Sequence, residues 1–219
     1  MNKDFSTVIN ELKSIIGDKF VITNKWSKQP FMNGWRYGKG DALAVLKPKT
    51  LLELWKILKL CISNDFIIIM QAANTGLTGG STPYGNDYDR PIIIINTLLI
   101  DDIHIINKSE QIIAFSGSTL YNLETKLKPF NRDPHSIIGS TSIGASIVGG
   151  VCNNSGGSLI KRGPAYTELA LYAKVNDDGE LELINDLGVN LGNKPEDILR
   201  NLENQNYDIN DIYNDKSKL

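Results

Sequence analysis

The chain has 219 residues, 41% hydrophobic and 22% charged, which excludes a chain that is disordered throughout and suffices for one large domain or two small ones. A net charge of −2 argues against a general nucleic-acid-binding surface, because such surfaces are usually basic. The chain has only two cysteines, which excludes a disulfide-rich scaffold, and neither has a partner at the spacing of a structural zinc site.

The first predicted element is a helix over residues 5–16, where apolar side chains recur on one face and Gly17 is a typical helix stop. Residues 26–40 follow, and they include two tryptophans, a proline and three glycines. We predict an irregular, packed loop for this stretch.

The next segments predict a strand, a helix and a second strand. A short strand is expected over residues 41–47, and an amphipathic helix over 51–63 begins at Thr50, with Glu53 completing a capping box. Residues 66–71 read FIIIMQ, which is typical of a fully buried strand. The three segments predict a βαβ unit with parallel strands. A polar loop then leads to another buried strand over residues 92–96.

After residue 100 the pattern becomes antiparallel. A hairpin is predicted from strands 103–106 and 111–116, then a helix capped by Ser118, and a second hairpin around the sequence Asn-Asp-Asp-Gly at 176–179. A short helix over 194–202 has Pro195 in its first turn. We therefore predict an α+β fold with two lobes. The predicted ranges are a smaller parallel lobe over about 1–98, a larger and mainly antiparallel lobe over about 99–205, and a frayed tail over 206–219.

A glycine-rich segment, residues 71–81, directly follows the apolar strand 66–71. Glycines at the carboxyl end of a strand let backbone N–H groups approach an anion, and Thr75, Thr78 and Ser81 add hydroxyl groups. A phosphate or pyrophosphate is the natural ligand, whereas the alternative is a glycine-rich surface turn. The segment matches neither a P-loop nor the dinucleotide fingerprint of the NAD-binding fold.

A second segment contains six glycines between Gly139 and Gly157, with small residues between them. By itself it is typical of a close-packed turn. Two such segments in one chain favour a flat cofactor held between two lobes.

The sequences AANTGLTGGSTPYGNDYDR and PHSIIGSTSIGASIVGGVCNNSGGSLIKRGPAYTEL carry a resemblance to a known family. They closely resemble the FAD-binding domain of the bacterial respiratory, quinone-dependent D-lactate dehydrogenases. Those enzymes belong to the vanillyl-alcohol oxidase and p-cresol methylhydroxylase superfamily. The resemblance extends from about residue 5 to about residue 205, and it implies the two-lobed FAD-binding fold of the p-cresol methylhydroxylase type.

The resemblance implies that FAD lies between the lobes, bound without a covalent link. The matching positions are Ala72, Ala73, Asn74, Thr75, Gly76, Gly80, Ser81, Gly139, Ser146 and Gly156. The residues themselves agree with this, because backbone donors suit a diphosphate and small residues let a cofactor pack closely.

The resemblance further implies oxidation of D-lactate to pyruvate, with electrons passed from FAD to a membrane quinone on the cytoplasmic side of the bacterial inner membrane. Members of the family are several hundred residues long, so we expect the substrate cap and the membrane-binding segment to be absent here. We therefore predict no catalytic residue in this chain, and we also expect no metal ligand. The longest apolar runs are too short to span a bilayer, so a soluble fragment with only peripheral membrane contact is expected. The alternative is a truncated flavin-binding module without turnover of its own.

Several single residues have a functional and a structural interpretation. His135 could neighbour the flavin, but a loop-ordering hydrogen-bond donor is favoured, and His104 is expected to be structural. Cys152 could form a covalent flavin link, which occurs in parts of the superfamily, but the branch that this chain resembles binds FAD noncovalently. Arg90 and Arg162 could bind phosphate, although surface ion pairs are favoured.

Two acidic residues in the polar loop, Asp87 and Asp89, raise the question of a metal site. Acidic side chains in a polar turn usually cap the loop itself, so we favour that role.

Overall fold

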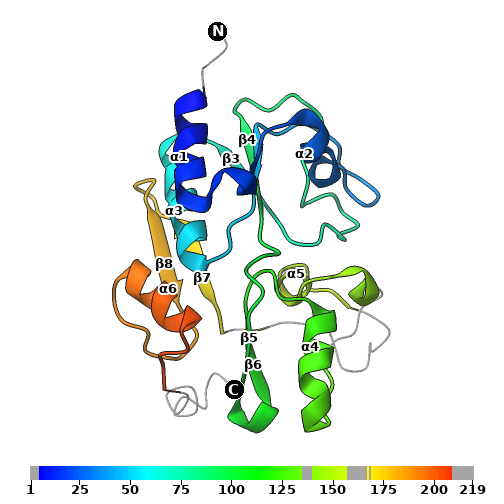
Figure 1. The fold of residues 1–219 in the computed structure, drawn as a ribbon, viewed down its shortest axis with the longest axis vertical. Coiled ribbons are helices and arrows are strands. Elements are labelled where there is room, and N and C mark those ends of the chain that lie inside the picture. Colours follow the sequence, from blue (N-terminus) through cyan, green and yellow to red (C-terminus); the bar gives the residue numbers. More distant parts are fainter. Residues whose placement is uncertain (1–4, 135–139, 157–166, 168, 209–219) are drawn as a thin grey trace. The chain divides into compact units, whose positions relative to one another are not determined.

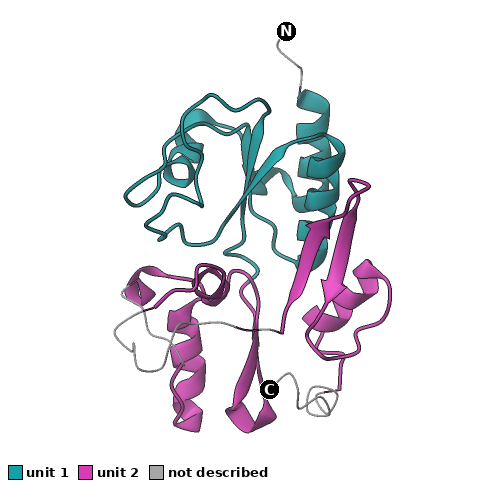
Figure 2. Ribbon diagram, turned by 180° about the vertical axis from the view of Figure 1, so that it is seen from behind, with its two compact units in different colours: residues 1–100 teal, residues 101–219 magenta. Residues whose placement is uncertain are grey.

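The computed structural model describes residues 5–134, 140–156, 167 and 169–208 (Figure 1). The chain divides into two compact units, residues 1–100 and residues 101–219 (Figure 2). The described helices are α1 Ser6–Ile16, α2 Lys25–Met32, α3 Leu51–Ser63, α4 Leu120–Leu127, α5 Ile147–Cys152 and α6 Pro195–Glu203. The strands are β1 Val21–Ile22, β2 Ala44–Leu46, β3 Ile67–Gln71, β4 Ile92–Asn96, β5 Ile103–Ile106, β6 Gln111–Ala114, β7 Leu171–Val175 and β8 Leu181–Asn185.

The first unit is built on a sheet with the strand order β1-β2-β4-β3. Strands β2, β4 and β3 are parallel, and β1 pairs antiparallel with β2. Side chains alternate between the faces of a strand, so β4 supplies Ile93 and Ile95 to the core under α1 and α3, and Ile92 and Ile94 to the core beside α2. The predicted βαβ unit is therefore present, with β4 inserted between its two parallel strands.

The prediction that residues 66–71 form a fully buried strand was wrong. Strand β3 lies at the edge of the sheet, its first four residues are only partly buried or exposed, and the Met70 side chain is 44% exposed. An apolar run of strand length does not distinguish a central position from an edge. Strands β2 and β4, which each have neighbours on both sides, are fully buried.

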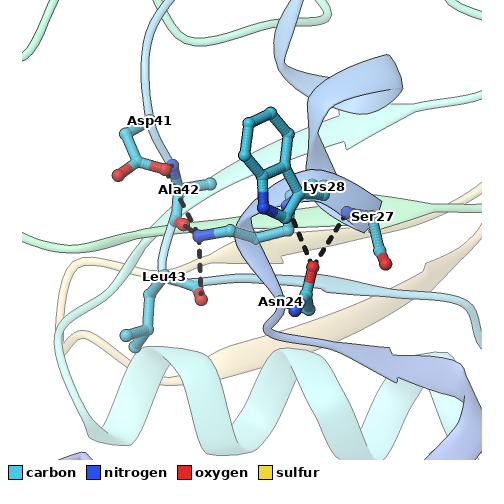
Figure 3. A network of polar contacts seen from close by, with 7 residues as sticks. Asn24, Ser27, Lys28, Asp41, Ala42 and Leu43 are labelled. Atoms are coloured by element: carbon cyan, nitrogen blue, oxygen red, sulfur yellow. Dashed lines mark hydrogen bonds and ion pairs between the residues drawn. The ribbon is translucent and has the colours of Figure 1, made fainter.

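The prediction of an irregular loop over residues 26–40 was wrong in its first part, which forms α2. The Asn24 side chain caps this helix by accepting hydrogen bonds from the backbone N–H groups of Trp26 (3.0 Å) and Ser27 (3.3 Å) (Figure 3). The buried Lys28 ammonium of α2 donates a hydrogen bond to the Ala42 carbonyl. This bond connects α2 to the segment directly before β2.

The second unit contains two antiparallel hairpins, β5-β6 and β7-β8, as the sequence predicts. Helix α4 packs on the first hairpin through Leu123 and Leu127. It is capped by Thr119, whose hydroxyl accepts from the Asn122 N–H at 3.1 Å, and not by Ser118 as predicted. The Ser118 hydroxyl instead donates to the Asp102 carbonyl at 3.0 Å. Helix α6 begins at Pro195, within one residue of the predicted start.

The stretch after α6 makes a specific contact within the second unit. The Tyr207 hydroxyl lies 2.8 Å from Nδ1 of His104 in β5. The His104 side chain is buried and packs edge-on against Phe115. Tyr207 is thus held in place although the sequence around it predicts fraying.

The chain has an α+β fold in which a largely parallel sheet is followed by antiparallel hairpins. Among the described residues, no helix is both long enough and apolar enough to cross a membrane.

Candidate functional site

The first glycine-rich segment begins where two parallel strands end. Gln71 and Asn96 are paired at the carboxyl ends of β3 and β4, and the loop of residues 72–81 starts from this point. The carboxyl edge of a parallel sheet is where ligands usually bind in open α/β structures. We call residues 72–81 the glycine loop.

The glycine loop presents backbone N–H groups that have no internal partner. Within the described part of the chain, the N–H groups of residues 73–76 and of Gly80 meet no hydrogen-bond acceptor. Asn74 adopts the left-handed conformation (φ 55°), which turns successive N–H groups in a new direction. A loop of this kind is a concave set of donors suited to an anion.

Two glycines of this loop leave space beside the backbone. A Cβ atom built on Gly76 or Gly80 would meet no heavy atom within 4 Å among the described residues. A pyrophosphate can therefore approach the backbone at both positions, so the residues present fit FAD at this loop.

The loop is held in shape by its own side chains. The Ser81 hydroxyl donates to Oδ1 of Asn74 at 2.7 Å, and Nδ2 of Asn74 donates to the Asn33 carbonyl at 2.8 Å. The hydroxyl hydrogen of Ser81 is thus used inside the loop, whereas the sequence predicts it as a donor to the ligand. Its backbone N–H remains available for that role.

Residues 33–40 form a second loop that supports the first. Gly38 has φ +91°, and a Cβ atom there would lie 2.1 Å from Oγ1 of Thr82. Gly40 pairs with Gly85 in a parallel bridge, and its Cβ would lie 2.4 Å from the Gly85 carbonyl oxygen. These close approaches require glycine, and they fix the chain directly after the glycine loop.

Two side chains that the sequence analysis did not single out, Gln71 and Asn96, close the base of the glycine loop. Both are buried, and they hydrogen-bond to each other at 3.2 Å. The signal in the sequence is a polar residue at the end of each of two apolar strands. By itself, however, that signal does not show that the two residues meet.

The second glycine-rich segment lies in the other unit. Ser146 is 5% exposed and caps α5 by accepting from the Gly149 N–H at 3.0 Å. A Cβ atom on Gly156 would meet nothing within 4 Å among the described residues, so this position is also open. Gly139 lies outside the described residues. The assignment of Ser146 and Gly156 to the FAD site stays a prediction.

Of the other candidates, Arg90 forms surface ion pairs with Asp65 at 2.6 Å and Asp89 at 3.2 Å, as its favoured interpretation predicts. His104 is buried in β5, and this burial lowers its pKa. His135 and Arg162 lie outside the described residues. No cluster of three or more potential metal ligands occurs in the part of the chain that the structure describes.

The two cysteines differ in their surroundings. Burial raises the pKa of the Cys61 thiol to about 12, so this thiol stays protonated at neutral pH. Cys152 is exposed at the end of α5.

One cleft of the first unit lies away from the glycine loop. Its volume is about 1080 Å³, and its lining includes Ala42, Leu43, Pro91 and Ile92, which lie at the amino ends of β2 and β4. A smaller hollow of about 620 Å³ is lined by residues of the loop 33–40 together with Tyr84 and Gly85. Among the described residues, none of those predicted to contact FAD lines either hollow.

Both glycine segments lie within the part of the chain that matches a known protein family. The family model of the FAD binding domain matches residues 42–184. The quinone-dependent D-lactate dehydrogenase of Haemophilus influenzae is 57% identical over 208 residues, covering 95% of this chain and 37% of that enzyme. The enzyme of the same name from Escherichia coli is 53% identical, covering 97% of this chain and 37% of that enzyme. The chain therefore spans little more than a third of the length of these curated relatives.

Solved structures with the same fold are more distant in sequence. Alkyldihydroxyacetonephosphate synthase superimposes with a TM-score of 0.69 at 14% identity, over 90% of this chain and 37% of that protein. p-Cresol methylhydroxylase superimposes with a TM-score of 0.64 at 14% identity, over 84% of this chain and 36% of that protein. These two likenesses establish the p-cresol methylhydroxylase type of fold that the sequence predicts.

Proposed function

The chain belongs to the FAD-binding domain family, and on this premise we propose that it is the FAD-binding part of a quinone-dependent D-lactate dehydrogenase. In this proposal the glycine loop holds the pyrophosphate through backbone N–H groups of Ala72–Gly76, Gly80 and Ser81. Gly139, Ser146 and Gly156 contact the adenosine and pyrophosphate half of the cofactor, and FAD is bound noncovalently.

One observation carries the proposal, which is the row of unpartnered backbone N–H groups at the carboxyl end of β3. The loop residues are half-buried or exposed, so water can satisfy these donors until an anion replaces it. An anion that receives several of these N–H groups at once is bound strongly and in one orientation. The open space at Gly76 and Gly80 lets that anion come close to the backbone.

The proposed reaction is the oxidation of D-lactate to pyruvate, with a membrane quinone as the final acceptor. Bound FAD supplies the group that takes up two electrons from the substrate and passes them on. The part of this chain is to bind and orient that cofactor, and we assign the proton-accepting residue to none of the described side chains. The proposed location is peripheral, on the cytoplasmic side of the bacterial inner membrane, with no nucleic-acid partner.

Absorption spectroscopy tests the cofactor assignment directly. The purified chain is mixed with excess FAD and desalted, and visible flavin bands that elute with the protein are the expected result. Acid denaturation should then release all flavin into the supernatant. Absence of flavin after desalting, together with no quenching of FAD fluorescence in a titration, would refute the binding proposal, and flavin retained by the denatured chain would refute noncovalent binding.

The second candidate function is a flavin-binding module without turnover, which the same loop geometry supports. A reconstitution experiment distinguishes the two candidate functions. The holoprotein is combined with the remaining segment of the Haemophilus influenzae relative, and D-lactate-dependent reduction of a dye is measured. Activity that appears only in the mixture supports the dehydrogenase assignment, whereas FAD binding without activity in any mixture supports the module.

A further inference from the structure

We propose that Gln71 is a positioning residue for FAD. Together with Asn96, it forms an amide clasp that fixes both ends of the glycine loop in the conformation that binds the pyrophosphate. The inference rests on the proposed function, because it assigns a role in shaping that same site. Neither residue belongs to the set predicted to contact the cofactor.

The Gln71 side chain joins the end of the glycine loop to a different part of the fold. Its amide nitrogen Nε2 donates to the Ser81 carbonyl at 2.8 Å and to the Phe31 carbonyl, near the end of α2, at 2.9 Å. Gln71 is only 3% exposed, so water does not readily replace these bonds. Gln71 lies directly before the loop, and its side chain therefore bonds both to Ser81, the last residue of the loop, and to α2.

The Asn96 side chain secures the other end of the loop. Its Nδ2 donates to the Ala72 carbonyl at 2.9 Å and to Oε1 of Gln71 at 3.2 Å, and Asn96 is 1% exposed. Both the first and the last residue of the loop are thus bonded to the same pair of buried amides.

The orientation of both amides follows from their partners. The carbonyls of Phe31 and Ser81 can only accept, so the Gln71 atom that faces them is the nitrogen, and its oxygen faces Asn96. The Asn96 nitrogen must then face Gln71 and the Ala72 carbonyl. The whole set has one consistent arrangement, which specifies a single geometry for the base of the loop.

The clasp uses main-chain carbonyls and leaves the N–H groups of the loop untouched. Carbonyls of Ala72 and Ser81 are the acceptors, whereas the N–H groups of residues 73–76 stay without an acceptor among the described residues. The loop is therefore stabilised without using the donors that the pyrophosphate needs. A loop already held in shape binds its ligand with a smaller entropic cost.

The test replaces the Gln71 amide, which donates in the clasp, with a carboxyl group, whose protonation depends on pH. In Gln71→Glu, a carboxylate cannot donate and lies against the Phe31 and Ser81 carbonyls, so FAD affinity at pH 8 should fall about tenfold or more. Burial beside carbonyl oxygens raises the pKa of a carboxyl group. Lowering the pH towards 5.5 should therefore protonate the new side chain, restore one donor and recover part of the affinity. The native partners of Gln71 are carbonyls and an amide, which do not titrate in this range. The FAD affinity of the wild type should therefore not rise as the pH is lowered.

Two further variants separate loss of the donor from introduction of a charge. Gln71→Met has a similar shape and no donor, so it should weaken FAD binding to a similar degree with no recovery at low pH. Gln29→Glu introduces the same carboxylate at an exposed position of α2 and should bind FAD as the wild type does. Thermal melting of each protein without FAD shows whether the fold is retained.

Each outcome has a definite meaning. Recovery of affinity at low pH in Gln71→Glu alone supports the clasp when thermal melting shows that this variant is folded at both pH values, because protonation of a buried carboxylate would also restore lost stability. Folded Gln71→Glu and Gln71→Met proteins that bind FAD as tightly as the wild type would overturn the clasp and leave the FAD site intact. If both fail to fold, Asn96→Leu must weaken FAD binding, and unchanged affinity there overturns the inference. A wild-type chain that binds no FAD overturns both the proposed function and the inference.

Discussion

The Ser81 hydroxyl lies 2.7 Å from Oδ1 of Asn74 and donates to it across the glycine loop. The same Asn74 amide donates to the Asn33 carbonyl, so one side chain links the loop both to itself and to its neighbouring segment. The loop therefore has a defined shape before any ligand binds. This relationship makes Ser81 a residue that holds the site in place as well as one predicted to contact FAD.

Replacing Ser81 with alanine should weaken FAD binding moderately. The variant loses one hydrogen bond with a net value of about 0.5–1.5 kcal/mol, which corresponds to about a 2- to 12-fold higher Kd. Titration of FAD fluorescence measures the change. Ser14→Ala is a matched control, because the Ser14 hydroxyl only bonds to the Glu11 carbonyl on the surface of α1. Equal affinities for Ser81→Ala and wild type would show that this bond does not shape the site.

Replacing Asn74 separates its backbone conformation from its hydrogen bonds. Asn74 has φ 55°, which glycine adopts freely and alanine adopts at a cost of about 1–2 kcal/mol. Both Asn74→Gly and Asn74→Ala lose the bonds to Ser81 and Asn33, so both should bind FAD less tightly than the wild type. Asn74→Ala should be the weaker of the two by about fivefold or more. The same titration decides this, and a tighter Asn74→Ala would contradict a left-handed Asn74 in the bound state.

The sequence predicts those parts of the fold whose signal is local. Helix α3 is an example, since Thr50 and Glu53 mark its first turn and the Thr50 hydroxyl accepts the Glu53 N–H at 3.0 Å. Helix α2 was missed because Pro30 and the nearby glycines suggested a loop, although Asn24 carried a capping signal. The edge position of β3 depends on where β4 inserts, and no pattern within β3 contains that information.

In the candidate site, too, features with a local sequence signal can be predicted, and contacts that depend on the tertiary fold cannot. The glycines predict a phosphate-binding loop because glycine lets backbone N–H groups approach an anion, whereas Asn74 is predicted only through the family resemblance. Gln71, however, bonds to a carbonyl 40 residues away in Phe31 and to Asn96, which is 25 residues away. Contacts of this kind are created by the tertiary fold, so a single sequence shows only that the two amides exist.

The stability of the chain should decrease as the pH falls below neutrality because of His104. Burial and the nearby Lys126 lower the pKa of this imidazole, and Asp102 opposes them. The unfolded chain therefore takes up the proton near pH 6.5, before the folded chain does, and stability is lost from there down to the lowered pKa. Melting temperatures between pH 7.5 and 5.5 should fall in the wild type and fall less in His104→Asn. An equal slope in His104→Asn would refute this assignment.

Substituting Gly38 should destabilise the chain even without cofactor. Gly38 has φ +91°, and a methyl group there would lie 2.1 Å from Oγ1 of Thr82. Backbone strain alone costs about 1–2 kcal/mol, and displacement of Thr82 adds to it. Gly38→Ala should therefore lower the melting temperature by at least about 4 °C. An unchanged melting temperature would mean that the loop 33–40 does not support the glycine loop as described.

Substituting Gly80 should leave the stability of the chain unchanged and weaken FAD binding, which makes it the more specific test of the FAD site. A Cβ atom on Gly80 would meet no described atom within 4 Å, and its φ is not in the left-handed range, so Gly80→Ala should melt within about 1 °C of the wild type. The added methyl group would, however, occupy the space through which a pyrophosphate reaches the backbone. FAD affinity should therefore drop by about tenfold, as expected for overpacking at a close contact. Fluorescence titration and thermal melting of Gly80→Ala and Gly38→Ala, measured side by side, check this opposition. If Gly80→Ala melts normally and binds FAD with wild-type affinity, the cofactor does not lie against this residue, and the pyrophosphate assignment must shift to the Ala73–Gly76 side of the loop.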